Sequence, residues 1–145
     1  MRYRIQKVLS KRTPALLWTV FIFILMAIPG NMLPHEEKTF IPNLDKLVHA
    51  TLFGTFVFLW SVYLDAKNEK KINSWSRSIS VLFIACLYGV GTELMQKYFI
   101  PNRDYDIYDI LADSIGAILG FLFVNLTIKW FKKDQVDESR TLLKK

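Results

Sequence analysis

Residues 89–120 read GVGTELMQKYFIPNRDYDIYDILADSIGAILG, and this stretch predicts a membrane hairpin. An apolar helix carries Glu93 and Gln96 near its end, and a short turn follows. A second apolar helix then carries Asp109 and Asp113 in its first turns. Ionisable side chains within apolar segments cost free energy unless they have partners, so they are functional candidates.

The composition is typical of a membrane protein with a single domain. The chain has 145 residues, 52% of them hydrophobic, and a mean hydropathy of +0.22. Its net charge is +6, but the basic residues cluster between apolar spans and form no continuous basic face. This distribution favours membrane orientation over nucleic-acid binding. Cys86 is the one cysteine in the chain, so an intrachain disulfide is excluded.

Four apolar spans follow one another along the chain, and each is long enough to cross a bilayer core. They are Thr13–Pro34, Leu47–Leu64, Ile79–Phe99 and Ile107–Ile128. The first span follows a basic segment, which also fits a secretory signal peptide. Its length and the lack of a small-x-small cleavage pattern near Ala27 favour an uncleaved helix.

We therefore expect an all-α fold, an integral membrane four-helix bundle. It comprises a basic tail at 1–12, a membrane domain at 13–133 and a charged, mobile tail at 134–145. Nearly all basic residues lie in the two terminal segments and in the middle loop, 65–78. The positive-inside rule then predicts cytoplasmic N and C termini.

This orientation places the polar residues of the spans at one face of the membrane. His49 lies near the start of an inward helix, Glu93 near the end of an outward helix, and Asp109 and Asp113 near the start of another inward helix. All four therefore lie toward the outer face. We expect a shallow polar pocket that opens outward, without a polar path through the bilayer.

The spacing of these residues indicates which helix faces meet. Steps of three and four residues put side chains on one face of a helix. Such steps group Asp45 with His49, Glu93 with Gln96, and Asp106 with Asp109 and Asp113. Gly89, Gly116 and Gly120 lie close to the same faces, and small residues allow membrane helices to approach closely. The acidic faces should therefore point at neighbouring helices and away from lipid.

The cluster suggests three sets of candidate residues. Candidates for acid–base chemistry are Asp45, His49, Glu93, Asp109 and Asp113. Candidates for holding a divalent cation are His49, Glu93, Asp109 and Asp113, since carboxylates suit hard cations. Candidates for ligand binding are Lys46, Gln96, Arg103 and Asp106. We further hypothesise that Arg103 turns inward and bridges the carboxylates, with a charged His49 or a cation completing the charge balance. The sequence identifies no cofactor.

Two segments, DKLVHATLFGTF at 45–56 and the stretch at 89–120, resemble the VanZ-like family of small bacterial membrane proteins. The shared pattern is Asp-Lys-x-x-His, then Glu-x-x-Gln, then Arg-x-x-Asp-x-x-Asp before a Gly-rich helix. It corresponds here to Asp45, Lys46, His49, Glu93, Gln96, Arg103, Asp106, Asp109, Gly116 and Gly120. The family often has Asn where this chain has Asp113.

The resemblance covers residues 44–123 and implies a multi-pass protein of the bacterial cytoplasmic membrane, associated with the cell envelope. The founding member is linked to resistance to the glycopeptide antibiotic teicoplanin. The resemblance implies no particular reaction.

Three functions are compatible with these observations. The first is binding of an outer-leaflet lipid, a lipid-linked wall precursor or an amphiphilic glycopeptide antibiotic. The second is a membrane-embedded enzyme that uses acid–base groups or a divalent cation on an envelope lipid, although the chain contains no established catalytic motif. The third is a small transporter. A structural alternative is that the polar residues only lock the helices together.

Overall fold

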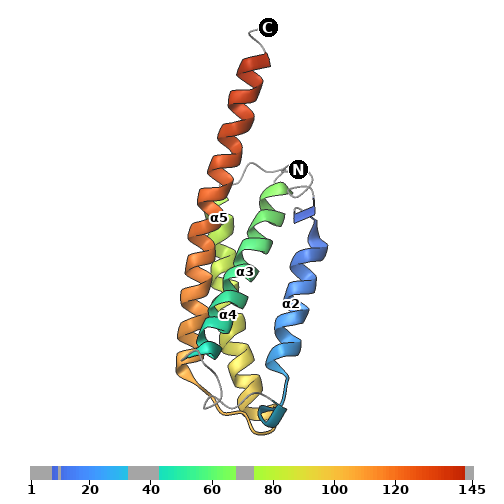
Figure 1. Cartoon of the computed structure of the whole chain (residues 1–145), viewed down its shortest axis with the longest axis vertical. Coiled ribbons are helices and arrows are strands. Elements are labelled where there is room, and N and C mark those ends of the chain that lie inside the picture. The colour runs from blue at the N-terminus through green and yellow to red at the C-terminus, as the bar shows by residue number, and fades with distance from the viewer. Residues whose placement is uncertain (1–7, 10, 33–42, 68–73, 143–145) are drawn as a thin grey trace.

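The computed structural model describes residues 8–9, 11–32, 43–67 and 74–142, with side-chain environments described as far as Thr127. Its helices are α2 (Arg12–Met26), α3 (Leu44–Ala66), α4 (Ser74–Phe99) and α5 (Ile107–Leu142), with a short 3-10 turn, η1 (Gly30–Met32). Within these residues there is no strand. The predicted all-α class is confirmed, and the helices form a bundle (Figure 1).

Three of the helices are long and apolar enough to cross a membrane. They are α3, α4 and the Ile107–Thr127 part of α5, with mean hydropathies of 1.7, 1.7 and 1.8. Long helices of this hydropathy, which satisfy their own backbone hydrogen bonds, are typical of bilayer-spanning segments. The chain is thus a membrane protein by the length and composition of its helices.

The first predicted span is wrong in its length. We expected a span across Thr13–Pro34, with Pro29, Gly30 and Pro34 marking its end. Helix α2 ends at Met26 after 15 residues, and Pro34 lies outside the described residues. At about 1.5 Å per residue this helix is roughly 22 Å long, less than the ~30 Å hydrocarbon core of a bilayer. The reason lies in Pro29, which cannot donate a backbone hydrogen bond and disfavours helical geometry in the residue before it.

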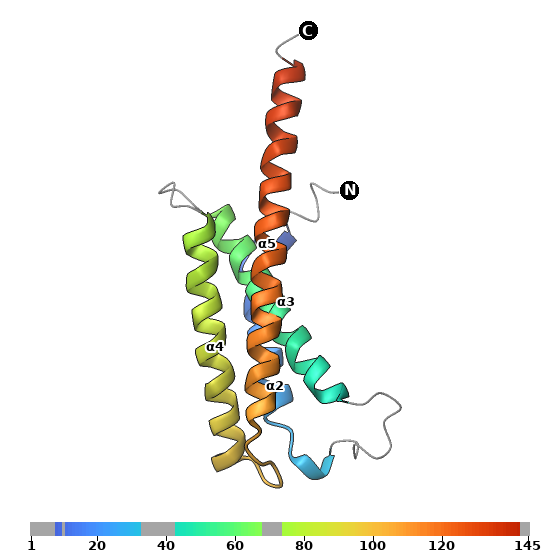
Figure 2. The same cartoon turned by 90° about the vertical axis from the view of Figure 1, so that its left-hand side faces the viewer.

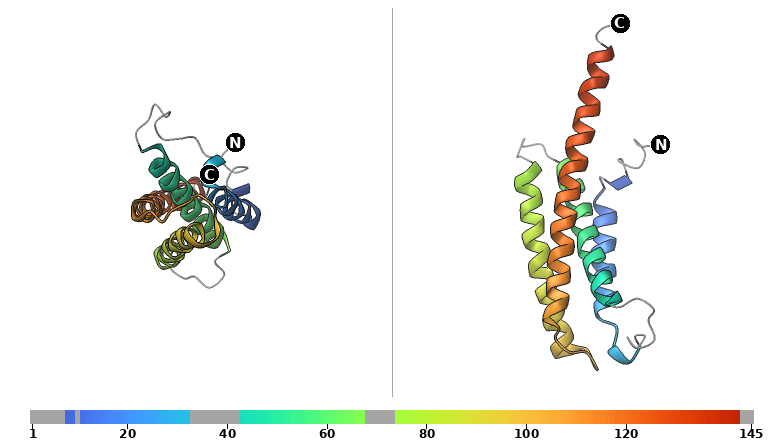
Figure 3. Two further views of the ribbon diagram at one scale, coloured as in Figure 1. Left: turned by 90° about the horizontal axis from the view of Figure 1, so that it is seen from below. Right: turned by 60° about the vertical axis from the view of Figure 1, so that its left-hand side comes forward.

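The two ends of the bundle carry different parts of the chain (Figure 1). The start of α2 and the end of α5 lie at one end, whereas η1 and the α4–α5 turn lie at the other. Figure 2 shows α3 running obliquely across the bundle, and Figure 3 shows the helices gathered side by side when viewed along their length. The start of α3, the end of α4 and the start of α5 therefore meet at one end, as predicted.

The last helix is longer than its membrane-spanning part. We expected a separate tail from Asp134, but α5 continues to Leu142, for 36 residues or roughly 54 Å. It projects beyond the other helices at the end opposite the α4–α5 turn (Figure 1). The backbone of this segment is therefore helical, while its mobility stays a prediction. Its sequence contains no Gly or Pro after Gly120, so nothing in it interrupts the helix.

Glycines let α3 and α5 pack in close contact. A Cβ atom on Gly116 would overlap the carbonyl oxygen of Ala50, and one on Gly120 would overlap that of Gly54. In return, a Cβ on Gly54 would lie 2.9 Å from the carbonyl oxygen of Gly116. The prediction that the glycine face of α5 meets a neighbouring helix is confirmed, and Gly54 provides its counterpart on α3.

The centre of the bundle is apolar, and α2 is attached to it by a few polar contacts. Buried core side chains include Ile22, Phe53, Val57, Val81, Ala85 and Ala117. Trp18 Nε1 donates a hydrogen bond to the Leu52 carbonyl at 3.0 Å, and the Tyr88 hydroxyl donates to the Thr19 carbonyl at 3.0 Å. These bonds join α2 to α3 and α4, and hydrogen bonds of this kind help to hold membrane helices together.

Candidate functional site

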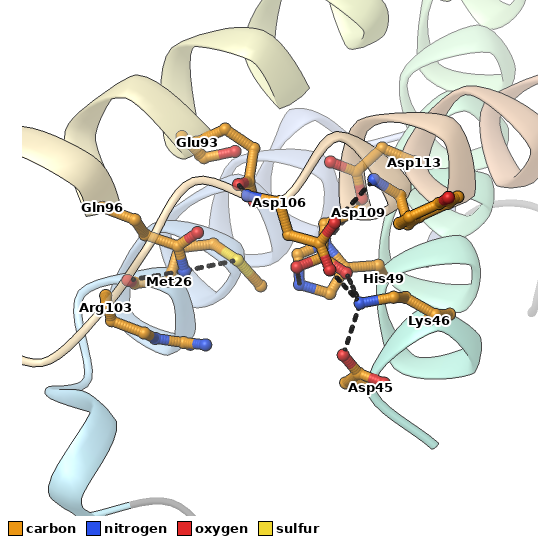
Figure 4. Close-up of polar contacts among 12 residues, drawn as sticks. Met26, Asp45, Lys46, His49, Glu93, Gln96, Arg103, Asp106, Asp109 and Asp113 are labelled. Carbon is orange, nitrogen blue, oxygen red and sulfur yellow. Dashed lines mark hydrogen bonds and ion pairs between the residues drawn. The ribbon is translucent and has the colours of Figure 1, made fainter. Parts of the chain in front are cut away.

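A polar cluster occupies the end of the bundle where α3 begins, α4 ends and α5 begins (Figure 4). Its members are Asp45, Lys46, His49, Glu93, Asp106, Asp109 and Asp113. The deepest are Glu93 and Asp113, with 0% and 1% of their surface exposed. The structure therefore brings together all five candidates for acid–base chemistry, from helices that are far apart in the sequence.

Lys46 is the centre of the outer part of the cluster. Its Nζ lies 2.8 Å from Asp45 Oδ2, 2.5 Å from Asp106 Oδ2 and 2.8 Å from Asp109 Oδ1. The hydrogen bond from Lys46 lowers the pKa of Asp106, which lies in the loop just before α5. One ammonium group thus ties the first turn of α3 to three carboxylates, and it remains partly exposed.

Arg103 does not take the bridging role that we hypothesised for it. Within the described residues it makes no ion pair with Glu93, Asp106 or Asp109. Its Nε donates to the carbonyl oxygen of Ile28 at 3.4 Å, and Figure 4 shows it beside Met26 and Gln96. Lys46 holds the bridging position instead, because the start of α3 is closer to the acidic turn of α5.

Gln96 and Arg103 both donate hydrogen bonds to backbone carbonyls at or just beyond the C-terminal end of α2. Gln96 Nε2 donates to the Met26 carbonyl at 3.2 Å, while the Gly30 N–H donates to the Pro101 carbonyl at 3.1 Å. The last carbonyls of a helix lack partners within the helix, so such donors stabilise its end. Both candidate ligand-binding residues are therefore engaged in joining α2 and η1 to the α4–α5 turn.

His49 is paired inside the bundle. Its Nδ1 lies 2.9 Å from Asp113 Oδ1, and its Nε2 lies 4.0 Å from Asp109 Oδ2. Gly89 of α4 leaves room for this pair, since a Cβ there would lie 2.9 Å from Asp113 Oδ2. The acidic face of α5 thus points at neighbouring helices, as the glycine pattern predicted.

Glu93 links α4 to the loop before α5. Its Oε2 accepts a hydrogen bond from the Asp106 backbone N–H at 3.2 Å. In the described part of the chain, Glu93 Oε1 and Asp113 Oδ2 are buried without a hydrogen-bond donor. A buried acceptor without a partner costs free energy, so both oxygens are positioned for a further ligand or proton.

Beside the cluster lies an apolar groove that the sequence analysis missed. It has a volume of about 420 Å³ and lies between α3 and α5. Its lining comprises Leu47, Ala50, Thr51, Gly54, Thr55, Phe58, Gly116, Leu119, Gly120 and Phe123. The signal that could have revealed it is the set of small residues on both helices. They let the two backbones approach closely, and they have no large side chains to fill the groove between the helices.

Comparison with known proteins assigns the chain to a family. The sequence profile described as VanZ/LLP1 matches residues 4–129, which is most of the chain. The chain belongs to the VanZ/LLP1 family. The resemblance inferred from the motifs is therefore confirmed, and the residues of the cluster and the groove all fall within the matched VanZ/LLP1 region.

A VanZ/LLP1 chain of this kind is also similar to a eukaryotic protein. An uncharacterized protein of Schizosaccharomyces pombe, C11E3.10, is 28% identical over 103 residues. The match covers 70% of this chain and 59% of the yeast protein. No solved structure matches the chain. Because this relative comes from yeast, the bacterial envelope setting and the link to teicoplanin stay predictions.

Proposed function

We propose that this VanZ/LLP1 protein binds an amphiphile of the outer membrane leaflet, with the polar head at the cluster and an acyl chain in the apolar groove. The observation that carries this proposal is the continuity of the two features along α3. Lys46 is a member of the cluster, and the next residue, Leu47, is the first lining residue of the groove. A ligand with one polar and one apolar part fits that arrangement.

The dimensions of the groove suit one leaflet. Its α3 lining runs from Leu47 to Phe58, which corresponds to roughly 16 Å along a helix. That length is close to half of the ~30 Å hydrocarbon core. Leu47, Leu119 and Phe123 are all exposed on the bundle surface, so the groove opens toward lipid. An acyl chain from the leaflet next to the cluster would therefore reach it without leaving the bilayer.

The chemistry of the cluster suggests which heads would bind. The exposed rim contains Asp45 and Asp106, and the buried Oδ1 atom of Asp45 has no donor among the described residues. Carboxylates accept hydrogen bonds and favour amine or hydroxyl donors. An aminated or polyhydroxylated head therefore matches the rim. Lipid-linked wall precursors and amphiphilic glycopeptides combine a polar head with an apolar part, so they belong to the same class of ligand.

Electron paramagnetic resonance with nitroxide-labelled lipids tests the proposal. The full chain in nanodiscs should immobilise labelled phosphatidylethanolamine more than labelled phosphatidylglycerol, since the rim is acidic. Thr51→Phe should reduce the immobilised fraction, because it fills the groove from an exposed position. The matched control is Ile84→Phe, at an exposed position on α4 outside the groove. Equal immobilisation in both variants, or no head-group preference, would contradict the proposal.

An enzyme is the second candidate, favoured by the contact between His49 and Asp113. A carboxylate 2.9 Å from one imidazole nitrogen fixes the tautomer and orients the ring, which is how many acid–base histidines are held. Asp45, Glu93 and Asp109 would then be the remaining acid or base groups. Release of a water-soluble head from a labelled envelope lipid would distinguish catalysis from binding alone.

A further inference from the structure

Three side chains from three different helices offer ligand atoms to one point inside the cluster. His49 of α3, Glu93 of α4 and Asp109 of α5 each present one such atom, and the three atoms lie within 4.8 Å of one another. Figure 4 shows these side chains converging from separate helices. Two ligand atoms in a tetrahedral zinc site, each 2.0–2.2 Å from the ion, lie roughly 3.3–3.6 Å apart. Side-chain rotations that move these atoms by roughly 1 Å would therefore bring all three onto one ion.

Each of these side chains is anchored by its other polar atom. His49 uses Nδ1 for Asp113, Asp109 uses Oδ1 for Lys46, and Glu93 uses Oε2 for the Asp106 backbone N–H. That leaves His49 Nε2, Asp109 Oδ2 and Glu93 Oε1 available. Such outer contacts orient the ligands of a metal ion, and a carboxylate on the far nitrogen of a ligating histidine is the commonest of them.

A separate observation indicates that a ligand is required. Glu93 is completely buried, and its Oε1 has no hydrogen-bond donor among the described residues. Buried carboxylate oxygens are normally paired or bound to a metal. Among the described residues that form the cluster, five are carboxyl groups and two, Lys46 and His49, are basic. A divalent cation would compensate this excess of acidic groups.

We propose that His49 Nε2, Glu93 Oε1 and Asp109 Oδ2 bind a divalent transition metal ion, Zn²⁺ or Mn²⁺. One imidazole nitrogen and two carboxylate oxygens suit these ions, whereas Mg²⁺ and Ca²⁺ prefer oxygen ligands alone. Three protein ligands leave further coordination positions for water or for a ligand's oxygen. Asp113 and Lys46 then position His49 and Asp109 and do not touch the ion.

Cation binding is measured without any labelled lipid or added head-group ligand, so it is scored separately from the lipid-binding proposal. The metal-free full chain in nanodiscs is titrated with Mn²⁺, and the free ion is followed by electron paramagnetic resonance. Zn²⁺ is titrated in competition with a chromophoric chelator. We expect saturable binding of one ion per chain, and Mg²⁺ should displace it poorly. A lack of saturable binding of both metals would overturn the proposal.

Variants locate the site. Glu93→Gln keeps an oxygen for the Asp106 N–H but removes the charge, and it should weaken binding by at least ten-fold. Asp104→Asn, at an exposed position in the α4–α5 turn, is the matched control and should bind as the original chain does. If Glu93→Gln fails to fold, Asp109→Glu retains the charge, displaces the carboxylate by one methylene and should weaken binding similarly. If a folded variant binds the metal as tightly as the original chain, the assignment of the site is wrong. An equal loss of metal affinity in Asp104→Asn would also overturn it.

A spectroscopic signature tests the imidazole directly. Bound Mn²⁺ should show hyperfine coupling to a nitrogen nucleus, since His49 is one of only two histidines in the chain. The coupling should survive His35→Gln and disappear in His49→Gln. Coupling that persists in His49→Gln would place the ion elsewhere and overturn the proposal.

Discussion

Lys46 Nζ lies 2.5 Å from Asp106 Oδ2, so the first turn of α3 is joined to the loop that precedes α5, 60 residues later in the chain. The same ammonium contacts Asp109, and the Asp106 backbone N–H contacts Glu93. Three helices therefore meet around one lysine. This connection explains how a small bundle keeps several acidic groups within one site.

Lys46→Met should destabilise the protein, because it leaves three carboxylates without their shared cation. Removing one partner of a buried ion pair costs about 3–5 kcal/mol. We expect about 2 kcal/mol here, since Lys46 is a quarter exposed and its interactions are partly screened. Thermal unfolding in detergent micelles measures the loss.

Two further variants separate charge from packing at Lys46. Adding Asp106→Asn to Lys46→Met should recover part of the stability, because it removes one of the stranded charges. Lys97→Met is the control, since Lys97 is exposed and contacts the rings of Tyr98 and Tyr105. A Lys46→Met protein as stable as the control would refute the central role of Lys46.

Gly116→Ala should weaken the packing of α3 against α5. Its Cβ would overlap the Ala50 carbonyl oxygen, a backbone atom that cannot rotate away. Overpacking a close contact typically costs about 1–3 kcal/mol. Gly91→Ala is the matched control, because a Cβ there meets nothing within 4 Å and alanine favours a helix by about 1 kcal/mol. Unfolding temperatures should fall for the first variant and hold or rise for the second.

The sequence predicted the helix pairing because it is encoded in residue spacing. Glu93, Asp109 and His49 sit near the ends of apolar spans, and alternating span directions bring those ends together. The glycines then indicated which faces meet, and the packing of Gly116 on Ala50 agrees. Each of these signals is local in the chain, so a single sequence is sufficient to detect it.

Other features depend on tertiary distances that spacing does not encode. Lys46 and Arg103 were both near the acidic residues in the sequence, and only the position of α3 decides that Lys46 reaches them. The position of the segment after α2 depends on the hydrogen bond from the Gly30 N–H to the Pro101 carbonyl in the α4–α5 turn. The groove was missed because it is a space between two helices, and no single residue encodes it.

Asp113→Asn should preserve the fold and reduce the affinity for the cation. The asparagine Oδ1 can still accept the hydrogen bond from His49 Nδ1, so the ring stays oriented. Loss of the charge behind a ligating histidine typically costs 10- to 100-fold in metal affinity, and we expect about ten-fold. Mn²⁺ titration measures the change. Asp113→Leu removes the hydrogen-bond acceptor, so its affinity for the cation should fall much further. Equal affinities in the two variants would contradict the role of Asp113 in positioning His49.

Acid should remove the contribution of Asp106 to stability. Its folded-state pKa is lowered by Lys46, below the value of about 3.9 for an unfolded chain. The stabilisation is therefore fully present above about pH 4 and is lost as the pH falls through the folded-state pKa. The difference in unfolding temperature between the original chain and Asp106→Asn should shrink across that range. A difference in unfolding temperature that stays constant with pH would contradict this role of Asp106.

The membrane orientation is the last prediction. The basic residues place both termini in the cytoplasm, so the cluster and the α4–α5 turn should face outward. In a Cys86→Ala background, Asn102→Cys in that turn should react with a membrane-impermeant maleimide added to intact cells. Lys67→Cys, at the exposed C-terminal end of α3, should react only after the cells are permeabilised. The reverse pattern would put the cluster at the inner leaflet, and the lipid-binding proposal would then apply to that leaflet instead.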